Sequence, residues 1–327
     1  MKISLVKNLL FTLPLLLSIY TLGQQDSIRF YPKLRPLILQ IEEVGTSNYT
    51  SRLMDEAFEK GEISRDLRIN AFLTLPILLK DRWFLTASIN YLHESIIIKD
   101  VKSSTEKFSR PESQDQFNIN DVSTNVNFIY LDTLWGRSIV YNGGLIIDSD
   151  NVISIDRLRG FASAFMSIMK TKYLSMRVGL VGLIDPISTL PILPVFSYRQ
   201  TFRNSTWRIN MTLPSNVSFR RPVLDKGWFT VGALLSGTSF FQSHNSELIS
   251  GDFEYSTTEI KSAFTFEYPI QKHFMLGVQT GIRSTIMARM REKGNNANDF
   301  TGDANRGSTP FINMSLSFAP VYKNKRR

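Results

Sequence analysis

The stretch Leu190–Phe241 constrains the fold of this 327-residue chain more than any other part of the sequence. It contains two short polar turns, at 203–206 and 225–227, and a tryptophan follows each of them. On both sides of these turns apolar and polar residues alternate, which is the two-residue period of a β-strand with two unlike faces. Because turn, aromatic residue and alternating run recur through most of the chain, the sequence predicts an all-β antiparallel meander.

Counting the alternating segments predicts about fourteen strands, an even number that places both chain ends on the same side. The clearest alternation lies at 66–75, 122–130 and 260–268. The count depends on 207–222, where Pro214 and Pro222 bracket two short runs that form either two strands or one bent strand. Twelve strands is the nearest alternative.

The predicted connections fall into two classes. Short turns lie near 80–82, 132–134, 170–172, 203–206, 223–227 and 270–273. Longer polar loops lie between most of them, near 45–62, 99–118, 149–158, 242–253 and 291–308. Short periplasmic turns and longer extracellular loops are typical of a transmembrane antiparallel β-barrel in a bacterial outer membrane.

An aromatic residue follows each short turn, and all four tryptophans of the chain are among these residues. Amphipathic rings are favoured at a lipid–water interface, where the ring contacts acyl chains and its polar atom stays hydrated. The sequence therefore predicts a membrane-interface aromatic girdle formed by Trp83, Trp135, Tyr173, Trp207, Trp228 and Phe274.

The opposite faces of the predicted strands carry charged residues. In a soluble β-sandwich or a lipocalin-like barrel they would form a solvated outer face, whereas in a membrane barrel they line a wet interior. The girdle and the asymmetry of the connections favour the membrane barrel. The polar residues expected to line its lumen are Arg68, Arg177, Arg199, Arg208, Glu259, Lys261, Glu267 and Arg283.

The N-terminus has the pattern of a secretory signal peptide. Lys2 and Lys7 form a basic n-region before an apolar run at 9–19, and a cleavage site follows at 21–23. The run is shorter than the roughly 20 residues of a membrane-spanning helix. We therefore expect a signal peptide at 1–23 and a single barrel domain at 24–327, exported to the outer membrane.

The bulk composition excludes several classes of protein. The chain has no cysteine, which excludes a disulfide scaffold, a thiolate metal site and a lipid-modified N-terminal cysteine. Its net charge of +9 suits contact with anionic lipopolysaccharide. The basic residues are spread over turns, lumen positions and the C-terminal tail, so no nucleic-acid partner is predicted.

Few residues indicate catalysis or metal binding. His93 and His244 lie near serines and could belong to a surface hydrolase, but no nucleophile-elbow motif accompanies them. Asp299 and Asp303 lie in a loop that could hold Ca²⁺, although their spacing fits no EF-hand. With no phosphate-binding, dinucleotide or Cys/His pattern, the sequence predicts no cofactor, no metal and no catalytic residue.

The segments LPVFSYRQTF, STWRINMTLPSNVSFRR, KGWFTVGALLSGTSFF and FTFEYPIQKHFMLGVQTGI together resemble a domain-of-unknown-function family of Gram-negative outer-membrane β-barrel proteins. The resemblance is strongest over residues 170–320. It implies the barrel fold and the outer membrane, and it implies no activity or site residue.

Two functions remain open at this stage. A barrel of about fourteen strands encloses more space than its side chains need to fill, which favours a porin-like channel or transporter for small solutes. The alternative is a non-conducting structural or binding barrel that presents its outer loops to a partner, and a surface hydrolase is a distant third. The expected contacts are outer-membrane lipids, lipopolysaccharide and small solutes.

Overall fold

The computed structural model describes residues 31, 35–103, 116–149, 155–185, 191–203, 205–245, 249–295 and 298–320. The predicted signal peptide at 1–23 lies outside these residues. In chain order the strands are β1 (Leu37–Val44), β2 (Ser47–Leu53), β3 (Glu56–Leu79), β4 (Trp83–Ser103), β5 (Gln116–Leu134), β6 (Arg137–Ser149), β7 (Arg157–Lys170), β8 (Leu174–Ile184), β9 (Ile192–Thr201), β10 (Arg208–Leu213), β11 (Asn216–Val223), β12 (Gly227–Asn245), β13 (Ser250–Pro269), β14 (Phe274–Glu292), β15 (Gly302–Arg306) and β16 (Thr309–Phe318). None of the described residues belongs to a helix long and apolar enough to cross a bilayer.

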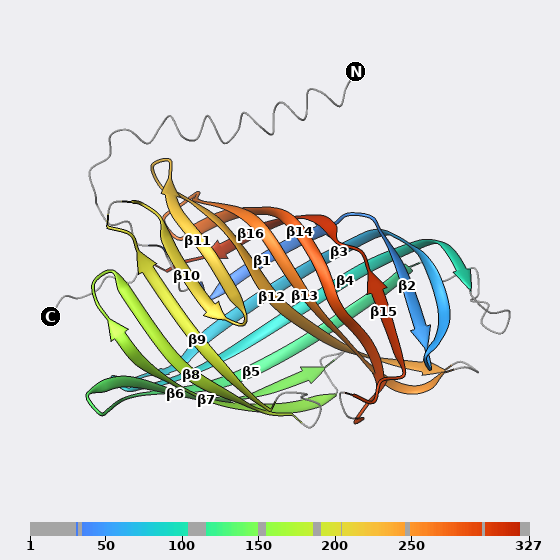
Figure 1. The fold of residues 1–327 in the computed structure, drawn as a ribbon, viewed down its shortest axis with the longest axis horizontal. Helices are drawn as coiled ribbons and strands as arrows, with labels where there is room; N and C mark the ends of the chain where they lie inside the picture. Colours follow the sequence, from blue (N-terminus) through green and yellow to red (C-terminus); the bar gives the residue numbers. More distant parts are fainter. Residues whose placement is uncertain are drawn as a thin grey trace, which may run out of the picture.

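Fourteen of these strands form a closed antiparallel ring (Figure 1). Neighbouring strands pair in chain order from β3 to β14, β14 pairs with β16, and β1 closes the ring by pairing with both β16 and β3. The other two strands, β2 and β15, pair with each other and extend the wall beyond β1 and β16. The predicted barrel of about fourteen strands is confirmed.

The segment 207–222 forms two strands rather than one bent strand. β10 and β11 are a short hairpin that turns at Pro214 and Ser215, and their register places Thr212 opposite Asn216. The two strands contain 6 and 8 residues, and β1, also with 8, is the only other described strand of the ring as short as β11. This hairpin makes the barrel wall low on one side.

The strands reach further into the long connections than the sequence predicts. Most of 45–62 belongs to β2 and β3, which meet in a two-residue turn at Met54 and Asp55, both with positive φ. β4 extends to Ser103, and β15 lies within 291–308. Here the strands carry polar residues on both faces, so the alternation that marks strands elsewhere is lost. We call the end of the barrel with these long connections the loop end. The opposite end, with the short turns, is the turn end.

The outer surface of the ring is apolar. Side chains from strands all round the ring are more than a third exposed, among them Leu39, Ile41, Ile69, Leu75, Ile89, Val126, Phe128, Leu145, Leu180, Phe219, Phe264, Ile282, Ile312 and Met314. A water-soluble protein rarely exposes a continuous apolar surface of this extent, whereas a barrel in lipid requires one. The protein is therefore a transmembrane β-barrel.

The interior is polar. Most of the described side chains that are buried are polar or charged, including Asp66, Glu254, Glu259 and Arg283 at 0–3 % exposure. A buried charge is retained only where it is paired and hydrogen-bonded. The inside of the ring is therefore held together by ion pairs rather than by an apolar core.

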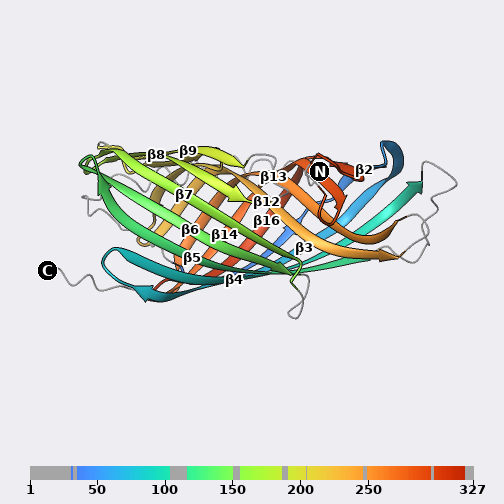
Figure 2. The same ribbon diagram turned by 90° about the horizontal axis from the view of Figure 1, so that it is seen from below.

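The barrel has an uneven wall and a flattened section. β3, β4, β13 and β14 contain 19–24 residues, whereas β8 and β9 next to the short hairpin contain 11 and 10. Figure 2 shows the flattening, and Cα atoms of β12 come within 8 Å of β5 and β6 across the lumen. The lumen is therefore narrowed where these walls meet.

Candidate functional site in the barrel lumen

One side of the inner wall carries a group of buried ion pairs that we call the central network. It contains Glu42, Asp66, Arg68, Glu94, Glu259, Lys261, Arg283 and Arg306. Nitrogen atoms of Arg68 lie 2.6 Å from Glu94, 3.3 Å from Asp66 and 3.5 Å from Glu259. Arg68 and these three carboxylates are at most 8 % exposed, so their charges are neutralised mainly by one another.

The same network joins strands at the seam where the chain ends meet. Arg283 of β14 pairs with Glu259 and also lies 3.4 Å from Asp66. Arg306 of β15 lies 2.5 Å from Asp66, and Lys261 of β13 lies 2.7 Å from Glu42 of β1. Side chains from β1, β3, β4, β13, β14 and β15 thus form one connected set on the inner wall.

A second group of ion pairs crosses the lumen nearer the loop end. This outer network contains Asp148, Arg157, Arg159, Glu254 and Arg291. Arg157 of β7 lies 3.3 Å from Asp148 of the adjacent β6 and 2.5 Å from Glu254 of β13, and it donates to Ser239 of β12 at 2.9 Å. Five strands separate β7 from β13 along the shorter way round the ring, so Arg157 links opposite walls.

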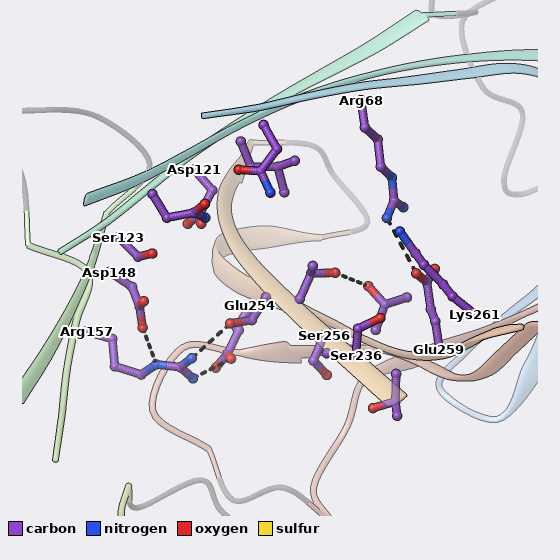
Figure 3. A pocket seen from close by; sticks show the side chains of 18 of the residues that line it. Arg68, Asp121, Ser123, Asp148, Arg157, Ser236, Glu254, Ser256, Glu259 and Lys261 are labelled. Atoms are coloured by element: carbon purple, nitrogen blue, oxygen red, sulfur yellow. Dashed lines mark hydrogen bonds and ion pairs between the residues drawn. The ribbon is translucent and has the colours of Figure 1, made fainter. Parts of the chain in front are cut away.

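A polar cavity of about 500 Å³ lies between the two networks (Figure 3). Asp148, Arg157 and Glu254 line one end, and Arg68 and Glu259 line the other. Its volume falls within the roughly 300–1,000 Å³ typical of small-molecule sites.

Among the described carboxylates that line this cavity, Asp121 has a buried oxygen without a hydrogen-bond partner. Its side chain is 8 % exposed, and its Oδ1 atom has no hydrogen-bond partner among the described residues. Figure 3 shows Asp121 on the same side of the cavity as Ser123 and Asp148. A buried carboxylate oxygen requires a donor, so this position suits water or a donor group of a bound solute.

At the turn end, residues that precede β1 lie inside the barrel. The Tyr31 hydroxyl donates to Glu267 at 2.8 Å, and Arg35 pairs with the same carboxylate at 2.5 Å. The Tyr31 ring packs edge-on against Trp228 at 5.3 Å, with the Arg220 guanidinium 3.6 Å from its centroid. Burial raises the pKa of Tyr31 to about 12, so its hydroxyl stays a neutral donor at physiological pH. Tyr31 and Arg35 therefore anchor the chain to the inner wall just before β1.

The low wall of the barrel, formed by β8 to β11, carries arginines that belong to neither network. Arg177 of β8 and Arg199 of β9 are exposed, and neither has a carboxylate partner among the described residues. Arg199 donates to Asn210, which is opposite it on β10. Arg208 and Arg220 are directly opposite each other on β10 and β11, where like charges repel. This side of the lumen is therefore basic.

The predicted lumen residues fall into three separate groups. Arg68, Glu259, Lys261 and Arg283 belong to the central network, and Glu267 anchors Tyr31 at the turn end. The third group, on the low wall, contains Arg177, Arg199 and Arg208.

Several lumen residues are absent from the sequence prediction. Asp66 shares the alternating polar face of Arg68, which was a usable signal. Arg157 lies in the predicted loop 149–158, and Glu254 directly follows the predicted loop 242–253. Their role depends on the strands that extend into those segments.

The six predicted girdle residues lie next to the short turns. Five of them have accessible rings, and the sixth, Trp228, does not. Trp83, Trp135 and Phe274 are 49 %, 82 % and 36 % exposed, and Tyr173 and Trp207 are half-buried beside arginine side chains. Trp228 is only 3 % exposed and packs inside the barrel against Tyr31, so its placement in the lipid-facing girdle is wrong. Phe229 begins the apolar alternation of β12, which puts Trp228 on the other face.

His93, His244 and Asp303 each contact a neighbouring side chain. His93 bonds Asn120 at 2.8 Å, and His244 bonds the Tyr255 hydroxyl at 2.6 Å. Asp303 pairs with Arg52 at 2.9 Å. No group of three or more metal-ligating side chains occurs among the described residues.

Comparison with known proteins returns distant similarities. No protein-family model and no curated protein sequence matches the chain. An outer membrane channel from Pseudomonas putida F1 is similar at TM-score 0.36 and 9 % identity, covering 90 % of this chain and 100 % of that one. The Pseudomonas putida toluene transporter TodX is similar at TM-score 0.39 and 11 % identity, covering 88 % and 90 %. The Salmonella typhi outer membrane phospholipase is similar at TM-score 0.31 and 9 % identity, covering 92 % and 96 %. Similarities this low assign no activity to the chain.

Proposed function

We propose that the protein is an outer-membrane channel for small polar solutes, and that the conformation described here is its closed state. The observation that carries the proposal is the charged cavity of about 500 Å³ inside a closed ring, bounded at one end by the Arg157–Glu254 ion pair that joins opposite walls and at the other by the central network. The apolar outer surface and the predicted signal peptide favour the outer membrane as its location.

The chemistry of the closure supports gating. Separated ion pairs regain hydration in a water-filled lumen, which offsets much of the attraction that is lost. Apolar side chains would close the lumen as well, but exposing them to water would cost about 25 cal/mol per Å². A barrel closed by charges can therefore open with a smaller change in free energy.

Arg157 is the residue whose removal tests the proposal, because it alone among the described outer-network residues contacts β6, β12 and β13. A hydrogen bond to a charged group contributes about 1.5–3 kcal/mol, which corresponds to a roughly tenfold to hundredfold change in an open–closed equilibrium. We expect Arg157→Ala to increase the open probability of single channels in a planar bilayer by at least the lower factor.

Arg159→Ala is the matched control. Arg159 also pairs with Asp148, at 2.7 Å, but its described contacts do not cross the lumen. Its open probability should match that of the unmodified protein, and a heat-modifiability gel would show that each sample is folded.

The second candidate function is a non-conducting barrel that presents its loop end to a partner. The cross-lumen ion pairs and the anchored Tyr31 favour it, because both obstruct the lumen. Electrically silent bilayers for both the folded unmodified protein and folded Arg157→Ala would support this candidate and refute the channel.

A further inference from the structure

The low wall does not reach the height of the rest of the barrel. Figure 1 shows the β10–β11 hairpin stopping short of the far ends of β12 and β13. A strand of 6 residues tilted by about 40° rises only about 15 Å along the barrel axis, against an apolar membrane band of about 25 Å. The tip of the hairpin therefore lies within the outer leaflet.

The tops of the low strands are apolar, as this depth requires. Ile184 at the end of β8 is 70 % exposed, Ile192 at the start of β9 is 64 % exposed, and Leu213 at the end of β10 is 41 % exposed. The tall strands end instead in polar residues such as Ser103 and Asn245. The low strands thus end in apolar residues and the tall strands end in polar ones.

Above the hairpin the wall has an opening between β9 and β12. Pairing of β11 with β12 ends at Leu234, and the Leu235 backbone N–H donates to the Ser215 carbonyl at 2.8 Å. Beyond this point β12 has only β13 as a paired neighbour among the described strands. The residues of β12 that follow, Ser236–Ser239, line the polar cavity. The opening therefore lies beside that cavity.

An apolar groove of about 680 Å³ lies at this opening. Leu180, Phe196 and Leu213 line it from the lipid-facing side, and Leu193 and Val195 line it from the other face of β9. Because residues of both faces contribute, the groove passes round the free edge of β9 where β10 has ended. A groove of this shape suits an acyl chain.

Two arginines without a described carboxylate partner lie below this opening, on β8 and β9. Arg199 is opposite Asn210, three residues below the end of β10, or about 10 Å along the strand. Arg177 is on the adjacent strand β8, opposite Ser197. An amphiphile with its acyl chain in the groove would place its head group toward these arginines, which favour an anion.

We propose that this opening is a lateral portal that binds a single-chain amphiphile with an anionic head group taken from the outer leaflet. The acyl chain lies in the groove of Leu180, Phe196 and Leu213, and the head group binds Arg177 and Arg199. This proposal does not rest on the proposed channel function. Binding at the portal can be measured whether or not the lumen conducts ions.

The first test measures the depth of the hairpin tip. The chain has no cysteine, so Ser215→Cys and the control Asn245→Cys can each be labelled with one fluorophore in nanodiscs. Lipids brominated on their acyl chains should quench the label at 215 and leave the label at 245 bright. A label at 215 that escapes quenching would refute a portal in the leaflet.

The second test measures binding of cis-parinaric acid, a fluorescent single-chain carboxylate, to the full-length protein in nanodiscs. Arg199→Gln should weaken binding about tenfold or more, Arg199→Lys should retain most of it, and the matching alcohol should bind more weakly than the acid. Arg221→Gln is the control, because Arg221 is on the same hairpin but contacts the Trp207 ring instead. Equal affinities of acid and alcohol, or equal losses in Arg199→Gln and Arg221→Gln, would overturn the anionic head-group site.

Discussion

The ion pairs of Arg68 in the central network lead to a prediction about the free energy of unfolding of the barrel. Replacing Arg68 with Gln removes the cation 2.6 Å from Glu94, for which no other ion pair is described, whereas Asp66 and Glu259 keep Arg283. Removing one partner of a buried pair leaves an uncompensated charge and costs about 3–5 kcal/mol. We expect a loss of this size in the free energy of unfolding of Arg68→Gln.

The double variant Arg68→Gln/Glu94→Gln separates pairing from simple disruption. It removes the stranded carboxylate together with the cation, so it should be less destabilised than Arg68→Gln alone, with a coupling free energy of at least about 1 kcal/mol. The measurement is urea unfolding of the barrel from phospholipid vesicles, followed by tryptophan fluorescence.

Arg52→Gln provides the comparison with an exposed ion pair. Arg52 pairs with Asp303 at 2.9 Å, but its side chain is 55 % exposed, so its loss should hardly change stability. If Arg68→Gln proved no more harmful than Arg52→Gln, or if the Arg68–Glu94 coupling were near zero, the central network would not stabilise the barrel as argued.

Three further predictions concern the turn end and the packing of the wall. Tyr31→Ala should expose Trp228 to acrylamide quenching, measured in a variant whose other tryptophans are phenylalanine; unchanged quenching would mean that Tyr31 does not cover that ring. Because the pKa of Tyr31 rises to about 12, its contribution to stability should be complete below pH 10 and disappear as pH rises towards 12, and Tyr31→Phe should abolish this pH dependence of the unfolding free energy. Gly144→Ala should destabilise the barrel by about 1–3 kcal/mol, because its Cβ would lie 2.7 Å from the Phe161 ring. Gly143→Ala, with its nearest atom at 3.6 Å, should be tolerated, and equal melting temperatures of the two glycine variants would refute this packing.

Local alternation was sufficient to predict the barrel. Side chains of a strand alternate between two faces, so the sequence around Arg68 or Lys261 already separates lipid-facing from lumen-facing positions. The short turns and their aromatic neighbours are equally local. The same pattern contained the correct orientation of Trp228, since Phe229 and Val231 take the lipid-facing positions after it.

The alternation was not informative where both faces of a strand meet water. The polar segments at 45–62 and 242–253 contain strand residues such as Tyr49 and Phe253, but their composition is that of loops. Hydrogen bonding to neighbouring strands, which no local pattern records, extends the barrel there.

The pairing of lumen charges and the height of the wall were decided only by the closed ring. Arg68 meets Glu259 across 191 residues of chain, and Arg157 reaches Glu254 across the flattened lumen. Ring closure brings these residues together, and burial then makes each charge depend on its partner. Alternation assigns a residue to a face, but strand register and ring closure determine which residue of another strand it meets.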